Sequence, residues 1–140
     1  MTDFVRRRHE RPVAQLVTNQ EAQLHLAGGF ETLLFSRTDP EDLARLDAQS
    51  RAEIAAAALS TLSAPRARGK ARIALQDVVI GGGRDKLTIV EAINDNMPFL
   101  LDSTLGEIAE QGLNLRLVAH PILSVDRDPS GGFVELKGEA

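Results

Sequence analysis

The spacing of apolar residues changes along the chain, and the main change falls near residue 70. Before that point apolar residues recur every three or four positions, which is typical of helices. After it they mostly alternate with polar residues or form short runs, which is typical of strands. The first helical stretch, residues 13–27, is weakly patterned, and the pair Gly28-Gly29 is expected to end it.

A second and clearer helix is predicted to begin at the sequence TDPEDL. Thr38 or Asp39 can serve as its N-cap, and Pro40 suits its first turn because that position needs no backbone N–H. The helix should end near residues 63–64, because Pro65 disfavours helical conformation in the residue before it. The apolar residues at helical spacing are Leu43, Leu46, Ile54 and Leu59.

A short basic linker, residues 65–70, leads to a predicted β-hairpin. A glycine-rich turn at residues 81–85 joins its two strands, and the second strand covers residues 87–93. This second strand is apolar on both faces, which is typical of a central, buried strand. The first strand is marked by Ile73, Leu75, Val78, Val79 and Ile80.

The next segment, AINDNMPFLLDSTLGEIAEQGL at residues 92–113, predicts a polar turn followed by a helix. Asp95 or Asn96 is expected to cap the helix, and Pro98 fits its first turn. Gly112 suits the position after the C-cap, where the backbone turns left-handed. One face of the helix carries Leu101, Leu105, Ile108 and Ala109.

Beyond residue 112 the apolar period becomes two, which predicts one long strand. A turn at residues 126–132 then returns the chain into a further strand that starts at Phe133. The predicted order is two helices followed by β-β-α-β-β, and it indicates an α+β fold with helices on one face of a sheet. The apolar face of the long strand carries Leu113, Leu115, Leu117, Ala119, Leu123 and Val125.

The composition is that of an ordinary globular domain. Of the 140 residues, 43% are hydrophobic and only 4% are aromatic, so the core must be mainly aliphatic. The absence of cysteine excludes disulfides, thiol catalysis and cysteine-bound zinc. No apolar run approaches the roughly 20 residues of a membrane helix, and no signal-peptide pattern is present. We therefore expect a cytoplasmic protein without membrane contact.

The net charge of −4 argues against a nucleic-acid partner, because there is no overall basic field to attract phosphate groups. The one basic cluster lies at residues 6–8. It could contact nucleic acid or an anionic surface, but a terminal segment of this kind is usually solvated. We expect residues 1–12 to form a flexible basic tail.

Two patterns invite an interpretation as chemical sites, and both lack the necessary context. The three glycines at residues 81–83 lie between strands, whereas a phosphate-binding loop needs them at the start of a helix. A metal site would need His120 to converge with several acids, and nothing in the spacing enforces this. The acids considered are Asp95, Asp102 and Glu107. We expect no catalytic residue, cofactor or metal in this chain.

The turn at residues 94–98 keeps two interpretations open. Its composition is that of a helix cap. A strand-to-helix turn also presents free backbone N–H groups that can hold a carboxylate, so ligand binding is the alternative.

The sequence VEAINDNMPFLLDSTLGEIAEQGLNLRLVAHPILSVDRD resembles the N-terminal region of the large bacterial NAD-dependent glutamate dehydrogenases. The shared features are an acidic D-M-P-F-L-x-D-S turn and helix, a His-Pro pair that ends a strand, and an R-D…G hairpin. The matching residues are Asp95, Met97, Pro98, Phe99, Leu100, Asp102, Ser103, Gly112, His120, Pro121, Arg127, Asp128 and Gly132. Asn96 departs from the pattern, which usually has a second Asp. The close resemblance covers about residues 87–132, and a looser one extends back to about Asp39.

The resemblance implies an N-terminal regulatory or assembly region of an enzyme that deaminates L-glutamate oxidatively, with NAD, to 2-oxoglutarate and ammonia. Enzymes of this family are homo-oligomers whose NAD-binding and catalytic domains lie downstream. These domains and further copies are the implied partners, and no NAD site is expected in this chain. A stand-alone amino-acid-binding module and a purely structural oligomerisation domain are the alternatives.

In that family the region resembles ACT domains, ferredoxin-like modules that often bind amino acids at a strand-to-helix turn. We expect a helical region and linker at residues 13–69 and an ACT-like domain at 70–140, with its last helix and strand missing and a sheet edge exposed. The implied effector-binding residues are Asn94, Asp95, Asn96, Met97, Pro98 and Asp102. Many ligand-binding ACT modules have Gly after the proline. Here Phe99 is expected to fill the ligand space or to pack into the core.

Overall fold

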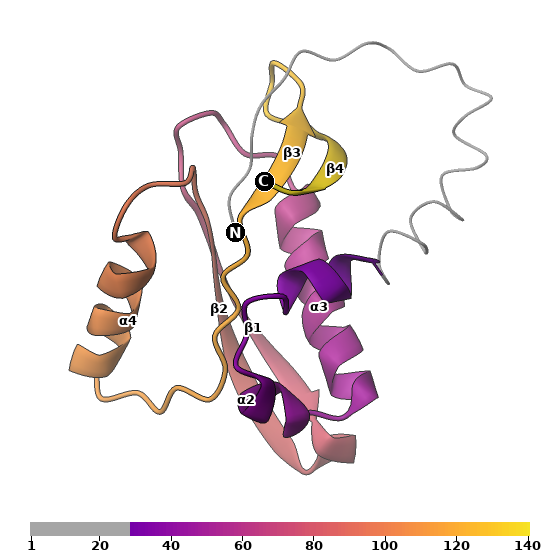
Figure 1. Ribbon diagram of the computed structural model, residues 1–140, viewed down its shortest axis with the longest axis vertical. Coiled ribbons are helices and arrows are strands. Elements are labelled where there is room, and N and C mark those ends of the chain that lie inside the picture. Colours follow the sequence, from indigo (N-terminus) through magenta and orange to yellow (C-terminus); the bar gives the residue numbers. More distant parts are fainter. Residues whose placement is uncertain (1–28) are drawn as a thin grey trace, which may run out of the picture.

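The computed structural model describes residues 29–140 and shows an α+β fold (Figure 1). The predictions for the basic tail and for a helix at residues 13–27 lie outside this range. The predicted order, helices followed by β-β-α-β-β, is confirmed within it. The elements are α2 (Pro40–Ala44), α3 (Ala48–Ser63), β1 (Arg72–Ile80), the 3-10 turn η2 (Gly81–Gly83), β2 (Asp85–Ile93), α4 (Leu100–Glu110), β3 (Leu123–Arg127) and β4 (Phe133–Glu139).

The helical part is divided differently from the prediction. Residues 29–34 are helical, so helical structure does not end at Gly29. The single helix predicted after Thr38 is wrong, because Asp47 starts a new helix by accepting a hydrogen bond from the Ser50 N–H at 2.7 Å. The predictions of Asp39 as the first N-cap and of a helix end at residue 63 are confirmed.

Strands β1 and β2 form the predicted antiparallel hairpin, closed by the glycines of η2. The side chains of one face, with Ile80 and Ile93, are turned toward α3 and the core. The prediction of a central strand buried on both faces is wrong, because within residues 29–140 β2 pairs with β1 alone and Val90 on its other face is 50% exposed. Figure 1 shows α3 and α4 on opposite sides of this hairpin, so these two helices do not share one sheet face.

Helix α4 ends as predicted, whereas the long strand after it is wrong. Gly112 has φ of +69° and donates its N–H to the Ala109 carbonyl at 3.0 Å, closing the last turn. Residues 113–122 alternate in polarity but belong to no strand. Of the long strand that was predicted, the part that is paired among the described residues is β3, whose partner is β4. Alternation reports which side chains can be buried, whereas a strand also needs a neighbouring backbone to pair with along its length. Within residues 29–140, a bond of this kind reaches the segment at its end, where the Ile122 carbonyl accepts from the Ala140 N–H at 2.9 Å, and no ladder of such bonds runs along residues 113–121.

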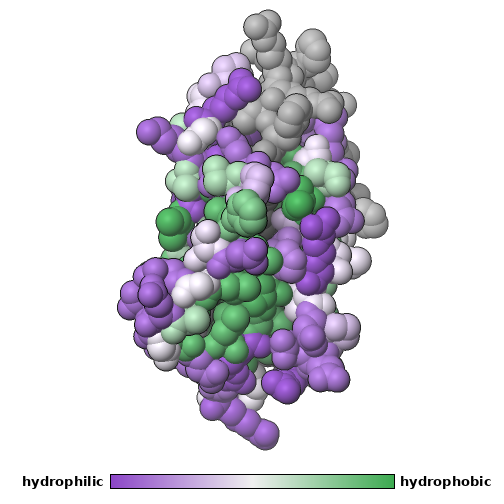
Figure 2. Space-filling model, turned by 60° about the vertical axis from the view of Figure 1, so that its left-hand side comes forward, coloured by the Kyte–Doolittle hydropathy of each residue, from purple (hydrophilic) through white to green (hydrophobic). Residues whose placement is uncertain are grey.

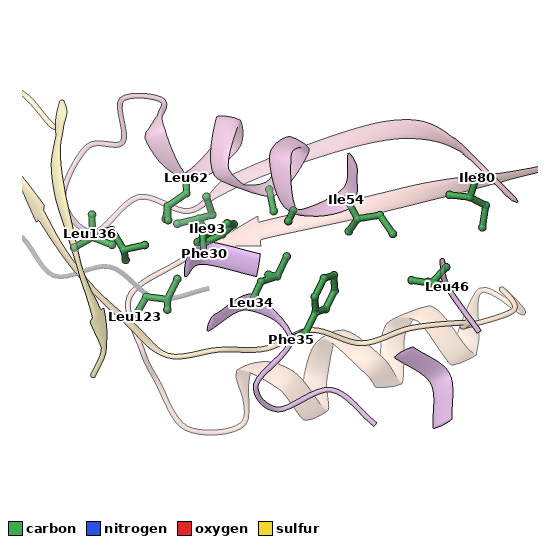
Figure 3. Close-up of a cluster of buried hydrophobic side chains, with 13 residues drawn as sticks. Phe30, Leu34, Phe35, Leu46, Ile54, Leu62, Ile80, Ile93, Leu123 and Leu136 are labelled. Carbon is green, nitrogen blue, oxygen red and sulfur yellow. The ribbon is translucent and has the colours of Figure 1, made fainter. Parts of the chain in front are cut away.

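The hydrophobic core draws on both halves of the described chain (Figure 3). Its helical members come from residues 30–62 and its strand members from β1, β2, β3 and β4. The helices and the two small sheets are therefore held by one set of contacts. The buried members are Phe30, Leu34, Phe35, Leu46, Ile54, Ala55, Ala58, Leu62, Ile80, Ile93, Leu123, Val125 and Leu136.

Candidate functional site

The residues of the polar turn lie together between β2 and α4. Asn94 and Asp95 are half-buried, and the next three residues are exposed, with Met97 at 49%. Asp102 is exposed in the first turn of α4. Within residues 29–140 no hydrogen bond joins Asp102 to the turn. Five of the six predicted residues therefore lie together in the turn, and Asp102 lies apart from them on α4. The exposed residues are Asn96, Met97 and Pro98.

The turn does not cap α4 as the sequence predicted. The residue before the helix is Phe99, which has φ of 63° and provides no side-chain cap bond. Asp95 and Asn96 lie several residues upstream, and Pro98 is outside the helix. The prediction fails because the Asp95 carboxylate is bonded elsewhere, to Arg66. The first backbone N–H groups of α4 therefore lack a side-chain acceptor from the N-cap position.

Phe99 combines two unusual properties. Among the described residues it is the one non-glycine with positive φ, a backbone state that costs on the order of 1–3 kcal/mol for such a residue. Its side chain is 76% exposed, so the expectation that it packs into the core is wrong. The position after the proline thus has a backbone suited to glycine and presents an aromatic ring to the outside.

Beneath the turn, Arg66 joins three segments through a buried side chain. Its guanidinium is 1% exposed and donates from Nη2 to Asp95 Oδ1 at 2.7 Å. Its Nη1 donates to the Lys70 carbonyl at 2.6 Å, and its backbone N–H donates to the Gly131 carbonyl at 2.9 Å. The arginine end of this ion pair is buried, so few waters compete for its hydrogen bonds, whereas the Asp95 side chain is 48% exposed. Arg66 thereby connects the turn to the linker after α3 and to the β3–β4 hairpin.

A second arginine, Arg127, lies beside it and is completely buried. Its Nη2 donates to the Leu62 carbonyl at 2.6 Å, and its Nη1 donates to the carbonyls of Ala64 at 2.9 Å and Gly131 at 3.1 Å. Leu62 and Ala64 belong to the C-terminal end of α3, where unpaired carbonyls favour a cation. We call Arg66, Asp95, Arg127 and Gly131 the arginine junction.

Burial lowers the pKa of Arg127, and the positive charge of Arg72 lowers it further, whereas Asp128 raises it. Arginine starts from so high a pKa that its guanidinium stays charged. The junction therefore holds two permanent positive charges, and the Asp95 carboxylate balances one of them directly.

The loop of the β3–β4 hairpin is shaped to meet the junction. Asp128 Oδ1 accepts from the N–H groups of Ser130 at 2.9 Å and Gly132 at 2.8 Å, which folds the loop back on itself. Gly131 has φ of +89°, and a Cβ atom there would collide with the backbone carbonyl of Arg66. Only glycine allows this approach of the two backbones.

The glutamate dehydrogenase ACT1 domain family matches residues 30–140. The chain belongs to this family. The resemblance of the sequence to an ACT-like region of a glutamate dehydrogenase is therefore confirmed. No match was found among curated proteins or among solved structures.

In this ACT1 domain, several residues that carried the resemblance meet at the junction. Asp95 belongs to the D-M-P-F motif, and Arg127, Asp128 and Gly132 belong to the R-D…G hairpin. Asp95 is reached through Arg66, and Arg127 and Arg66 bond the same Gly131 carbonyl. The two motifs, about 30 residues apart in sequence, thus form one structural unit.

Sequence reasoning missed Arg66 and Arg127. Arg66 was assigned to a basic linker, and only its ion pair with the half-buried Asp95 reveals its role. For Arg127 a signal existed, because it has the same parity in β3 as Leu123 and Val125, which face the core. An ionisable residue on an inward-facing strand position predicts a specific set of buried partners.

Within residues 29–140 of this ACT1 domain, no group of three or more His, Cys, Asp or Glu side chains is arranged to hold a metal ion. His120 is half-buried, and its Nδ1 has no hydrogen-bond partner within the described range. No helix in that range is long and apolar enough to cross a membrane.

Proposed function

We propose that this ACT1 domain is a regulatory and assembly region of an NAD-dependent glutamate dehydrogenase and takes no direct part in catalysis. The reaction of the enzyme would be the oxidation of L-glutamate, with NAD and water, to 2-oxoglutarate, ammonia and NADH. Family membership supports the glutamate dehydrogenase part of this proposal. The NAD part rests on the resemblance, and comparing the rates with NAD and NADP in the whole enzyme tests it.

The observation that carries the assembly role is the uncovered face of the β1–β2 hairpin. Leu75 and Val90 are opposite each other on this face and are 69% and 50% exposed. Ile73 and Val79 on the same face of β1 are 71% and 55% exposed. We call these four residues the outer face. Figure 2 shows apolar side chains gathered within polar surroundings on the face it turns forward. Contiguous exposed apolar surface of this kind favours association.

A second copy of the domain is the partner that we assign to the outer face. The test is the mass of the purified domain in solution by light scattering, over a range of concentrations. We expect a dimer or larger species, and Leu75→Lys should shift it to monomer because a charge would be buried at the contact. Ala52→Lys is the matched control, since Ala52 is exposed on α3 and away from this face. A wild-type domain that stays monomeric at every concentration contradicts the assembly role.

A second candidate role is amino-acid binding at the turn. It is favoured by the uncapped N-terminus of α4, whose backbone N–H groups suit a carboxylate. The residues proposed to bind are the five of the turn together with Asp102. We expect L-glutamate, or another amino acid from a panel, to raise the melting temperature of the domain in a saturable way. If none of the panel shifts the melting temperature or gives heat in calorimetry, the effector role fails while the assembly role is untouched.

A further inference from the structure

The arginine junction connects two loops that have no direct bond to each other. The turn at residues 94–99 contacts it through Asp95, and the β3–β4 hairpin contacts it through the Gly131 carbonyl. Arg66 is the residue common to both, since its side chain bonds the first and its backbone N–H bonds the second.

We propose that Arg66 is a positioning residue that couples the turn at residues 94–99 to the loop of the β3–β4 hairpin. A change in the hydrogen bonding of Asp95 then alters the stability of the hydrogen bonds at residues 128–132. The coupling is a property of the domain without any ligand. Its use for regulation rests on the effector role proposed above, because only then is the turn the place where a signal arrives.

Two features make Arg66 a stiff link. Its guanidinium is 1% exposed, so it cannot exchange Asp95 for water without moving, and the loss of Asp95 leaves a buried charge without its carboxylate. Its backbone carbonyl lies where a Cβ atom of residue 131 would be, so the hairpin loop has no free space in which to absorb a shift of Arg66.

Arg127 extends the link to α3. The Gly131 carbonyl accepts from both Arg66 N and Arg127 Nη1, at 2.9 and 3.1 Å. A displacement of Gly131 would therefore disturb the bonds by which Arg127 holds the end of α3, namely those to Leu62 and Ala64. The turn, the hairpin and the helix end are thus joined by consecutive hydrogen bonds.

Hydrogen exchange of backbone amides tests the coupling. The reporters are the N–H groups of Gly131 and Gly132, which bond the Asp128 carbonyl and the Asp128 side chain. Asp95→Asn should speed their exchange about fivefold or more, the size expected for residues in one bonded network. Glu110→Gln is the matched control, because Glu110 is an exposed acid of α4 outside the proposed binding residues and has no ion pair inside the described range. It should leave both amides unchanged.

A faster exchange at every amide in Asp95→Asn would mean general destabilisation, and unchanged exchange at residues 131 and 132 would mean no link. Either result overturns the proposal. The route is tested with Arg66→Lys, which keeps the charge but loses the planar fork. In that background Asp95→Asn should no longer alter the two amides. An unaltered effect of Asp95→Asn there would show that Arg66 is not the link.

The outcome is separable from that of the effector role. Exchange is measured without ligand, so the coupling can be present in a domain that binds no amino acid. If an amino acid does bind, reciprocity requires that Gly131→Ala, made in the hairpin, also changes its affinity. Binding that is unchanged by Gly131→Ala, together with unchanged exchange in Asp95→Asn, would leave the effector role standing and the coupling refuted.

Discussion

Two ionisable side chains, Arg127 and Glu91, are buried in different parts of the molecule, and their partners differ. Arg127 is fully buried and donates to the carbonyls of Leu62, Ala64 and Gly131. Glu91 is 5% exposed in the joint between α3 and the β1–β2 hairpin. Its Oε1 accepts from Gln76 Nε2 at 2.7 Å, and its Oε2 has no hydrogen-bond partner within residues 29–140.

The difference shows what a buried charge requires. The carbonyls at the end of α3 are fixed dipoles that point their negative ends at Arg127, so the cation replaces its water with protein acceptors. Glu91 is instead bonded by neutral side chains, those of Thr61 and Gln76. Burial raises the pKa of Glu91, and the bonds from Thr61 and Gln76 lower it by less. Arg127 is therefore held as an ion, whereas the surroundings of Glu91 favour its neutral form.

Removing the charged side chain of Arg127 from the arginine junction should give the largest change in stability. Arg127→Met keeps much of the side-chain volume but takes this donor from the Leu62 and Ala64 carbonyls and one of two donors from the Gly131 carbonyl. We therefore expect the free energy of unfolding to fall by about 3–5 kcal/mol. Urea denaturation measures it. Arg45→Met is the control, because Arg45 has a 74% exposed side chain, and it should change stability little. A loss for Arg127→Met as small as that of the control would show that the buried ion stabilises nothing.

The geometry around Arg127 can also be disturbed from the backbone. Gly131→Ala places a Cβ atom against the Arg66 carbonyl at a positive φ, and we expect a loss of about 2–4 kcal/mol by thermal or urea denaturation. Gly106→Ala is the control in α4, where nothing lies within 4 Å of an added Cβ, and it should stabilise by roughly 0.5–1 kcal/mol. Equal changes in stability for Gly131→Ala and Gly106→Ala would refute the close approach of the Gly131 and Arg66 backbones.

Glu91 should make stability depend on pH. With its folded pKa above the unfolded value, the folded state binds more protons between the two values, so stability is full below the unfolded pKa and falls as the pH rises through the folded one. Glu91→Gln removes the titration and should be the more stable protein at high pH, by about 1–3 kcal/mol. Urea denaturation at several pH values between about 4 and 8 measures this. If the wild type and Glu91→Gln keep parallel pH profiles, while the control Glu110→Gln behaves as wild type, Glu91 is not the group responsible.

Local features of this fold could be predicted from the sequence, and features that depend on distant partners could not. Asp39 as a cap and the helix end at Gly112 follow from neighbouring residues, and both are confirmed. The role of Asp95 was wrong because its carboxylate is bonded to Arg66, 29 residues away. The strand predicted at residues 113–122 was wrong because, although its pattern fits a strand, no ladder of backbone bonds runs along residues 113–121 in the described chain.

For the two buried ionisable residues, the sequence predicts one property and not another. Arg127 follows Leu123 and Val125 at inward positions of β3, and Glu91 lies between Ile89 and Ile93 at inward positions of β2. The alternation therefore predicts that both are buried. It does not predict the charge state of either, because this depends on whether helix-end carbonyls or neutral side chains lie opposite, and that is set by packing of the helix on the sheet.

The smallest effect is expected on the outside of the hairpin that carries Glu91. On the side of the hairpin that carries the outer face, Asp77 and Lys86 form an ion pair at 3.1 Å, with side chains 52% and 63% exposed. Thr88 donates to Asp77 at 2.8 Å. The bonds from Thr88 and Lys86 lower the pKa of Asp77, opposite to the shift of Glu91 across the same strands. In water such a pair competes with solvent and salt, so at concentrations where the domain is monomeric Lys86→Ala should leave the urea midpoint unchanged within error, at low and high salt alike. A clear, salt-dependent loss in the monomer would show that this exposed ion pair itself stabilises the hairpin.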